Sequence, residues 1–185
     1  MMFNRKSYGF TLIELLIVIV IIAVLVTITA SSYREAQESS RDSKRKSDLA
    51  KLEAALERFY SDNNKYPNDN GVGGLIVCPD GTALTWGEDH AFQCTIGGSD
   101  KVYMNEMPKD PRDSRGYFYN ATDINNNPCD NNDTNSGNDC FKYIISAQIE
   151  DAQDKDVINL TGCSPQTGAT PTYNYCVPRG QRKQV

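Results

Sequence analysis

The sequence predicts an α+β protein in which one long N-terminal helix is followed by a small antiparallel sheet with disulfide-stapled loops. Three observations lead to this prediction. An almost uncharged apolar run extends from Leu12 to Ala30, a helical stripe of apolar residues follows between Leu49 and Phe59, and all six cysteines lie in the polar remainder of the 185-residue chain. This length accommodates one globular domain and one long accessory element.

The apolar run is long enough to cross a membrane as a helix. It contains 19 residues, and its only charge is Glu14. About 20 apolar residues span the hydrocarbon core of a bilayer. A cleaved secretory signal would have an apolar core of about 7 to 15 residues and a cleavage site flanked by small residues. The run is longer and no such site follows it, so we expect the segment to be retained.

The charges that flank the run give conflicting indications of its orientation. Arg5 and Lys6 precede it, whereas five cations follow it: Arg34, Arg41, Lys44, Arg45 and Lys46. Counting cations alone would place the head domain in the cytoplasm. Six cysteines instead indicate an oxidising compartment, and acidic residues are interleaved with the later cations. We therefore expect the head outside the cytoplasm.

The helical pattern continues beyond the run and becomes amphipathic. Leu49, Leu52, Leu56 and Phe59 recur at steps of three and four residues, with charged residues between them. We expect this stripe to be buried against the sheet of the head rather than in a coiled coil. Asp62, Asn63 and Asn64, with Pro67 after them, predict the end of the helix.

The head predicts antiparallel strands packed on this helix. Residues Tyr117–Asn120 and Phe141–Ile149 carry the β-branched and aromatic content typical of strands. Between them, Asp123–Asp139 is so rich in Asn, Asp and Gly that it predicts a surface loop.

The cysteines favour disulfides over a metal site. None is spaced as C-x-x-C, and the single His90 leaves too few nitrogen ligands for the common Cys/His zinc sites. Six cysteines allow 15 connectivities. Sequential pairing closes the shortest loops: Cys78 with Cys94, Cys129 with Cys140, and Cys163 with Cys176.

Two stretches of the loop place oxygen ligands at alternate positions, as calcium requires. These are Asp133, Asn135, Gly137 and Asp139, and also Asp123, Asn125 and Asn127. Both lack the glutamate that completes an EF-hand, so the residues favour a solvated acidic loop, with calcium as the alternative.

Charge and motif content argue against two classes of function. Residues 61–185 hold 10 Lys and Arg against 17 Asp and Glu, a balance of −7, which disfavours non-specific nucleic-acid binding. Trp86 and His90 show no catalytic spacing, and no nucleophile or nucleotide motif accompanies them. We expect neither an enzyme nor a required cofactor.

Specific residues at the start of the chain resemble a known processing signal. Gly9-Phe10-Thr11-Leu12-Ile13-Glu14, after a short basic leader and before an apolar run, resembles the class III signal of type IV prepilins. The later stretch Ala55–Pro67 is similar to bacterial pilins and to the major type II secretion pseudopilin. Looser similarity continues at Met107–Pro111 and Tyr143–Ala147.

The resemblance implies a pilin fold divided into a cleaved leader (1–9), a transmembrane or filament-core half of the helix (10–32), an amphipathic half (33–62) and an extracytoplasmic head (63–185). A prepilin peptidase would cut between Gly9 and Phe10, and the new amine of Phe10 would be N-methylated. The resemblance also raises the case for calcium in the head, because this family often binds it there.

A role for Glu14 follows from physical chemistry. A carboxylate within a membrane costs free energy unless it has a partner, and the amine of Phe10 from a neighbouring subunit would be one. Singly, these positions have simpler explanations, since Thr11 and Glu14 also fit the capping box that opens many helices. Together, with the leader and the run in place, they favour assembly into a helical homo-oligomer.

The leading interpretation is thus a type IV pilus subunit, inserted in the cytoplasmic membrane as a precursor and then part of an extracellular filament. The alternative is a type II secretion or competence pseudopilin in a short periplasmic filament. In either case the family implies a prepilin peptidase, an assembly ATPase and an inner-membrane platform protein as partners. A monomeric, membrane-anchored binding domain is a further alternative.

Overall fold

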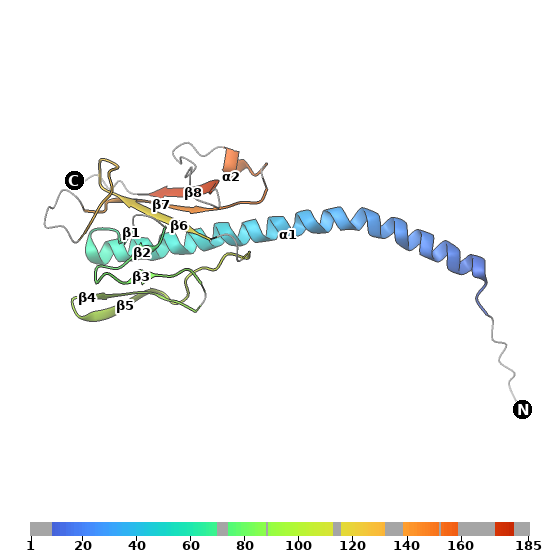
Figure 1. Cartoon of the computed structure of the whole chain (residues 1–185), viewed down its shortest axis with the longest axis horizontal. Coiled ribbons are helices and arrows are strands. Elements are labelled where there is room, and N and C mark those ends of the chain that lie inside the picture. Colours follow the sequence, from blue (N-terminus) through green and yellow to red (C-terminus); the bar gives the residue numbers. More distant parts are fainter. Residues whose placement is uncertain are drawn as a thin grey trace, which may run out of the picture. The chain divides into compact units, whose positions relative to one another are not determined.

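The computed structural model of the chain describes residues 9–69, 74–87, 89–112, 116–131, 139–151, 153–158 and 173–179 (Figure 1). Its helices are α1 (Leu12–Asn63) and α2 (Lys155–Ile158). Its strands are β1 (Asn68–Asp69), β2 (Ile76–Val77), β3 (Ala83–Leu84), β4 (Phe92–Ile96), β5 (Ser99–Met104), β6 (Phe118–Thr122), β7 (Lys142–Ala147) and β8 (Tyr175–Arg179). The predicted α+β class is confirmed.

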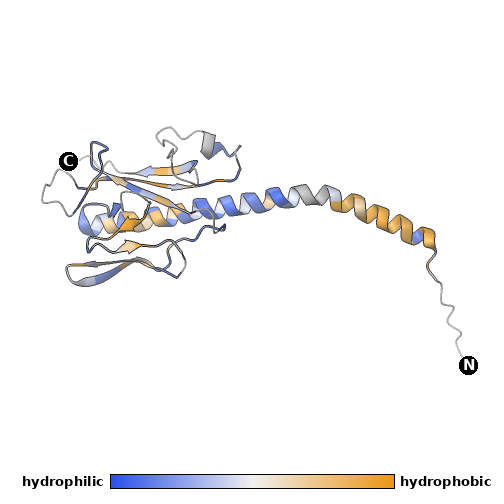
Figure 2. Cartoon of the chain, viewed as in Figure 1, coloured by the Kyte–Doolittle hydropathy of each residue, from blue (hydrophilic) through white to orange (hydrophobic). Residues whose placement is uncertain are grey.

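The chain divides into two compact units, Met1–Ser40 and Arg41–Val185. The described part of the first unit is almost entirely helical, because α1 begins at Leu12 and continues through it. Its large apolar side chains between Leu12 and Val26 have exposed fractions of 48% to 91%. Figure 2 shows this stretch as a nearly continuous hydrophobic run.

The second unit contains three small antiparallel sheets. β1, β2 and β3 form one, the β4–β5 hairpin forms another, and β6, β7 and β8 form the third in that order. The hairpin turn consists of Gly97 and Gly98, whose φ angles are 60° and 81°. Two successive positive φ angles define the turn type that suits the twist of a two-residue hairpin, and glycine adopts them without strain.

The two strands predicted from sequence correspond to β6 and β7, which pair from Phe118 with Ser146 to Thr122 with Lys142. The antiparallel strands expected after the helix are present, and they form three small sheets rather than one. The strands of the first sheet are only two residues long, too short to show alternation. The Gly97-Gly98 pair between β4 and β5 was a hairpin signal that the sequence reasoning overlooked.

The core lies around the last turns of α1. Leu49, Leu52, Leu56 and Phe59 are all 0% exposed, so the predicted burial of this stripe in the head is confirmed. The Phe59 ring lies 5.9 Å from that of Phe92 on β4 and 5.1 Å from that of Tyr103 on β5. The helix ends at Asn63, where the side-chain amide donates to the carbonyl of Phe59 at 2.8 Å.

Two of the three sequential disulfides are present among the described residues. Cys78 is joined to Cys94, and Cys129 to Cys140. Cys176 also forms a disulfide, while Cys163 lies outside the described residues. The first bridge ties the end of β2 to β4, and the second closes the loop between β6 and β7.

Candidate functional site

The residues predicted to carry assembly lie at the start of α1, where Thr11 and Glu14 cap the helix. The backbone amide and the hydroxyl of Thr11 donate to Oε2 of Glu14 at 2.9 and 2.7 Å. The amide of Glu14 in turn donates to Oγ1 of Thr11 at 3.3 Å. This reciprocal pattern is a capping box, in which two helix-terminal amides are satisfied by side chains. In the single chain, Glu14 therefore has Thr11 as its partner.

The surroundings of this cap are apolar and uncovered. Phe10 is 83% exposed and Leu12 is 91% exposed. Length and composition allow α1 to cross a membrane near the N-terminus, and none of its most apolar stretch is buried within the chain. An uncovered run of this size requires lipid or other protein chains to shield it from water.

A second group of functional interest was missed from sequence and is centred on Arg45 of α1. The Arg45 side chain is 0% exposed, and its Nε and Nη2 donate to both carboxylate oxygens of Asp110 at 2.8 and 2.9 Å. Its Nη1 donates to Asp42 at 2.7 Å and to Glu150 at 2.8 Å. One buried guanidinium thus joins α1 to two segments distant in sequence.

Glu150, which follows β7, completes the network. It accepts two hydrogen bonds from Arg41, at 2.8 and 2.7 Å, and pairs with Arg112 at 3.0 Å. The carboxylate of Asp42 accepts the backbone amides of Glu150 and Asp151, both at 3.0 Å. Every charge in this network is paired with an opposite charge, as buried ions require.

These contacts change the protonation equilibria of the network. Hydrogen bonds from Arg41, with a contribution from Arg45 and against the opposing effect of burial, lower the pKa of Glu150 to about 2. Burial would lower the pKa of Arg45, but its three carboxylate partners outweigh this effect and raise that pKa. Glu150 and Arg45 therefore both stay charged at neutral pH.

The same contacts explain the conflict over orientation. Arg41 and Arg45 are cations that flank the apolar run, but both pair with acids of the head, Glu150 for both and Asp110 for Arg45. Lys46 is similarly held by Asp154 at 2.7 Å and Asp156 at 2.6 Å. In the folded head these positive charges are neutralised, so they have a structural role that explains their presence after the apolar run. No signal in the sequence linked these acids to these cations.

The calcium candidates are only partly described by the structure. Asp133, Asn135 and Gly137 lie outside the described residues, and Asp139 accepts a hydrogen bond from Lys65 at 3.2 Å. No metal-binding group of His, Cys, Asp and Glu is found among the described residues. Calcium at residues 133–139 stays a prediction.

The second calcium candidate is folded around its own hydrogen bonds. Oδ1 of Asp123 accepts the backbone amides of Asn125 and Asn127 at 2.8 and 2.7 Å. Nζ of Lys142 donates to the carbonyl of Ile124 at 2.6 Å and to Oδ1 of Asn126 at 3.0 Å. A lysine ammonium thus supplies positive charge to the oxygens of this turn.

Comparison with known protein families gives two matches, one to the N-terminal signal and one to the part of the chain that follows it. Residues 4–30 match the prokaryotic N-terminal methylation motif, and residues 32–135 match protein G of the type II secretion system (T2SS). The chain belongs to the T2SS protein G family.

Members of this family from three bacteria are similar to the chain over stretches of similar length. Type II secretion system core protein G of Klebsiella pneumoniae is 33% identical over 108 residues, which are 58% of this chain and 70% of that protein. The Aeromonas hydrophila protein is 31% identical over 109 residues, or 58% and 69%. The Vibrio cholerae protein is 32% identical over 108 residues, or 58% and 66%. No solved structure matches the chain.

These matches favour one of the two interpretations of the sequence. The resemblance to the pilin and major pseudopilin family is confirmed. The protein G family favours the pseudopilin, which was the alternative, over the type IV pilus subunit, which was the leading interpretation. Pilin and pseudopilin share the N-terminal signal, so that signal alone could not separate them.

Proposed function

We propose that the chain is a structural subunit of a type II secretion pseudopilus, a short filament in the periplasm. The observation that carries this proposal is the protein G match over residues 32–135, which includes the part of α1 that is buried in the head. The exposed apolar half of the same helix supports polymerisation, because it needs cover that the described chain does not provide.

Before assembly, the exposed run would be shielded by lipid. The methylation motif spans residues 4–30 and includes the predicted cleavage position. We propose that a prepilin peptidase cuts after Gly9 and that the amine of Phe10 is then N-methylated. The precursor would be anchored in the cytoplasmic membrane, with the head in the periplasm, where disulfides form.

In the filament, Glu14 would exchange its partner. The capping contacts with Thr11 keep its carboxylate satisfied in the single chain. When helices from several copies pack together, the positively charged amine of Phe10 from a neighbour would pair with this carboxylate. Two charges at 4 Å attract by about 4 kcal/mol at an effective dielectric of 20. Desolvation offsets most of this attraction, so the pair would set the register between helices more than it adds affinity.

Assembly of this kind requires work but no chemistry from the subunit itself. Helices gain little hydrophobic free energy by associating within lipid, whereas a subunit drawn out of lipid must cover its apolar run with other helices. We propose that a cytoplasmic ATPase and an inner-membrane platform protein supply and direct that work. The role of the chain is therefore structural rather than catalytic.

Mass spectrometry of the native protein and secretion assays would test this function. The expected N-terminus is N-methyl-Phe10, and deletion of the gene should abolish secretion of substrates that leave through the type II system. An intact Met1 would contradict the processing step. Normal secretion, together with long surface filaments made of this chain, would instead show that it serves a type IV pilus.

The charge of Glu14 can be separated from its capping role. Glu14→Gln keeps an oxygen that can accept from Thr11, because Gln serves in capping boxes as Glu does. It removes only the negative charge, and filaments should be lost. Thr11→Ala is the matched control, since it weakens the cap by about 1 kcal/mol but keeps the charge. Filament yields from Glu14→Gln equal to those of the parent would refute the proposed charge pair.

A further inference from the structure

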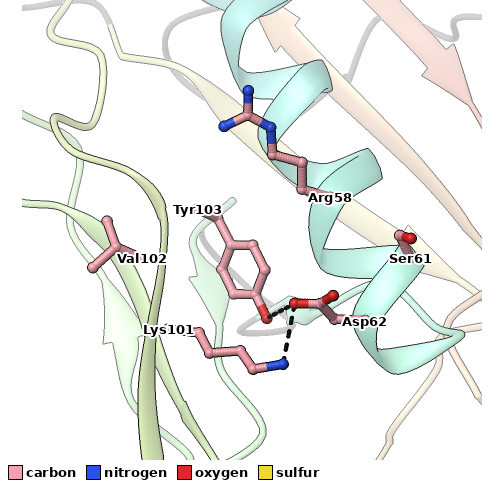
Figure 3. A pocket seen from close by; sticks show the side chains of 6 residues that line it. All are labelled: Arg58, Ser61, Asp62, Lys101, Val102 and Tyr103. Atoms are coloured by element: carbon pink, nitrogen blue, oxygen red, sulfur yellow. Dashed lines mark hydrogen bonds and ion pairs between the residues drawn. The ribbon is translucent and has the colours of Figure 1, made fainter.

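A shallow hollow lies beside the end of α1. It has a volume of about 440 Å³ and is lined by residues from the last turns of the helix and from β5: Arg58, Ser61, Asp62, Lys101, Val102 and Tyr103 (Figure 3). β5 pairs only with β4 among the described strands, so its other edge is free in this part of the chain.

Most charges in the hollow already have partners. Asp62 accepts from Nζ of Lys101 at 3.2 Å and from the hydroxyl of Tyr103 at 3.3 Å. These contacts, drawn as dashed lines in Figure 3, join the helix to the hairpin. Asp62 and Lys101 thus neutralise each other. The net charge of the hollow therefore comes from the one other charged side chain that lines it.

Arg58 is that side chain, and it is exceptional in the head. It is exposed and forms no hydrogen bond or ion pair within the described residues. By contrast, hydrogen bonds or ion pairs to oxygen atoms hold the side chains of Arg41, Arg45, Lys46, Lys51, Lys65, Lys101, Arg112 and Lys142. An unpaired guanidinium beside a hollow is suited to bind a carboxylate from outside the chain.

The charge of the head indicates where such a carboxylate comes from. Residues 41–185, the second compact unit, carry 16 Lys and Arg against 21 Asp and Glu, a balance of −5. Neighbouring copies in a filament repel one another through charges of this sign. A contact that places an unpaired cation against a neighbour's acids reduces this repulsion at close range. A charged residue such as Lys101 on the edge strand also disfavours addition of another strand, so side-chain docking fits better.

Two carboxylates on α1 match this requirement. Glu35 and Glu38 form no hydrogen bond or ion pair within the described residues, and their spacing of three places them on one face of the helix. Asp89 and Glu106 on the head are also without such partners, but neither lies on the helix through which copies are proposed to polymerise. Copies that polymerise through parallel helices bring α1 of one copy beside its neighbours. Two adjacent acids on that helix present a stronger negative potential than a single one.

We propose that the Arg58 hollow of one subunit binds Glu35 and Glu38 on helix α1 of a second copy of this chain. The contact rests on the proposed filament and adds a defined charge pair between the head of one copy and the helix of another. It involves no residue of the N-terminal cap.

Charge exchange tests this contact in cells that assemble the filament. Arg58→Glu should lower the yield of filaments recovered from the periplasm and cell envelope by about fivefold or more, because it removes an exposed ion pair worth up to about 1 kcal/mol and puts like charges in its place. The double variant Glu35→Lys, Glu38→Lys should lower it similarly. Combining all three substitutions restores opposite charges and should restore the yield. Parental yield from Arg58→Glu, or no recovery in the combined variant, would overturn the proposal.

Two controls separate this contact from other causes of poor assembly. Lys51→Glu makes the same change of net charge on the same helix, but Lys51 already pairs with Asp48 at 3.5 Å. Its filament yield should fall much less than that of Arg58→Glu. N-methyl-Phe10 should be present in every variant, which shows normal insertion and processing. If the parent itself made no filaments, the proposed function would fail as well; parental filaments with indifferent Arg58 variants would reject this contact alone.

Discussion

The stretches of α1 before and after Ser40 differ in how far similar apolar side chains are buried. Before it, leucines, isoleucines and valines between Leu12 and Val26 are about half exposed or more. After it, Leu49, Leu52 and Leu56 are 0% exposed, and even Arg45 is fully buried. One helix therefore contains a stretch whose partners lie within its own chain and a stretch whose partners must come from outside.

This difference shows which properties the head provides by itself. The later stretch has its stability built in, through an apolar core and a paired charge network. The large apolar side chains between Leu12 and Val26 are not buried in the single chain, so their sequence is explained by lipid and by assembly. Substitutions in the two stretches should therefore alter different measurements, and the following predictions test how complete that separation is.

The largest effect is expected from Arg45→Ala. The substitution leaves Asp110 and Asp42 without their charged partner in a buried site, and Glu150 keeps only Arg41 and Arg112. Removing one partner from a buried ion pair costs about 3–5 kcal/mol. Chemical denaturation of the detergent-solubilised protein, followed by near-ultraviolet circular dichroism, would measure the loss.

Arg34→Ala is the control for that substitution. Arg34 is exposed on the first stretch of α1 and has no partner within the described residues, so a change within about 0.5 kcal/mol is expected. A loss below 1 kcal/mol for Arg45→Ala would show that the network adds little to the head.

A matched pair of leucine truncations compares the two stretches directly. Leu52→Ala removes a side chain from the core and should lower the free energy of unfolding by about 2–5 kcal/mol. Leu16→Ala, at a position that is 57% exposed, should leave the unfolding of the head unchanged. The same denaturation experiment serves both, and equal losses would contradict the separation of the two stretches.

The sequence predicted the features that repeat or stand close together. The apolar run, the stripe from Leu49 to Phe59 and the helix end near Asn63 are local patterns set by helix periodicity and polar stop signals. Strands β6 and β7 were also predicted from a local pattern, which is their β-branched and aromatic content. The motif from Gly9 to Glu14 also indicated the family, because its residues are contiguous.

The rest depended on contacts between distant segments. Nothing local links Arg45 to Asp110 or to Glu150, so three charges that look solvent-exposed in the sequence form a buried network. The division into three sheets likewise depends on how short strands find partners along the chain. The residues that separate pseudopilins from pilins were not evident without comparison to relatives, since the two groups share their N-terminal chemistry.

An intermediate effect is expected from acid. The pKa of Glu150 is lowered to about 2 in the folded head, against 4.5 ordinarily. A lowered carboxyl pKa stabilises the fold above the ordinary value, and this contribution disappears as the pH falls from about 4.5 to 2. The shift corresponds to about 3 kcal/mol. Denaturation midpoints measured between pH 6 and pH 2 should follow this course.

Glu150→Gln separates this titration from those of other carboxyls. The variant should be less stable than the parent at neutral pH, because Arg41 and Arg45 lose a charged partner. It should lose less additional stability between pH 4.5 and pH 2. Parallel pH profiles for the two proteins would show that the low pKa of Glu150 does not contribute to stability.

The smallest effect concerns Tyr117, whose buried hydroxyl donates to Asp48 on α1 at 2.8 Å. Tyr117→Phe removes this bond and leaves the carboxylate with Lys51 at 3.5 Å, a loss of about 1.5 kcal/mol.

Burial, with the nearby charge of Asp48, raises the pKa of Tyr117 well above 10. At a pH at which the unfolded chain ionises, the folded state still keeps the phenol protonated. The parent therefore loses stability as the pH rises above about 10. Tyr33→Phe, at a 66% exposed position on the first stretch, should change neither the free energy of unfolding nor its dependence on alkaline pH. If the stability of Tyr117→Phe fell at alkaline pH as it does in the parent and in Tyr33→Phe, the bond between Tyr117 and Asp48 would not stabilise the later stretch of α1 in the head.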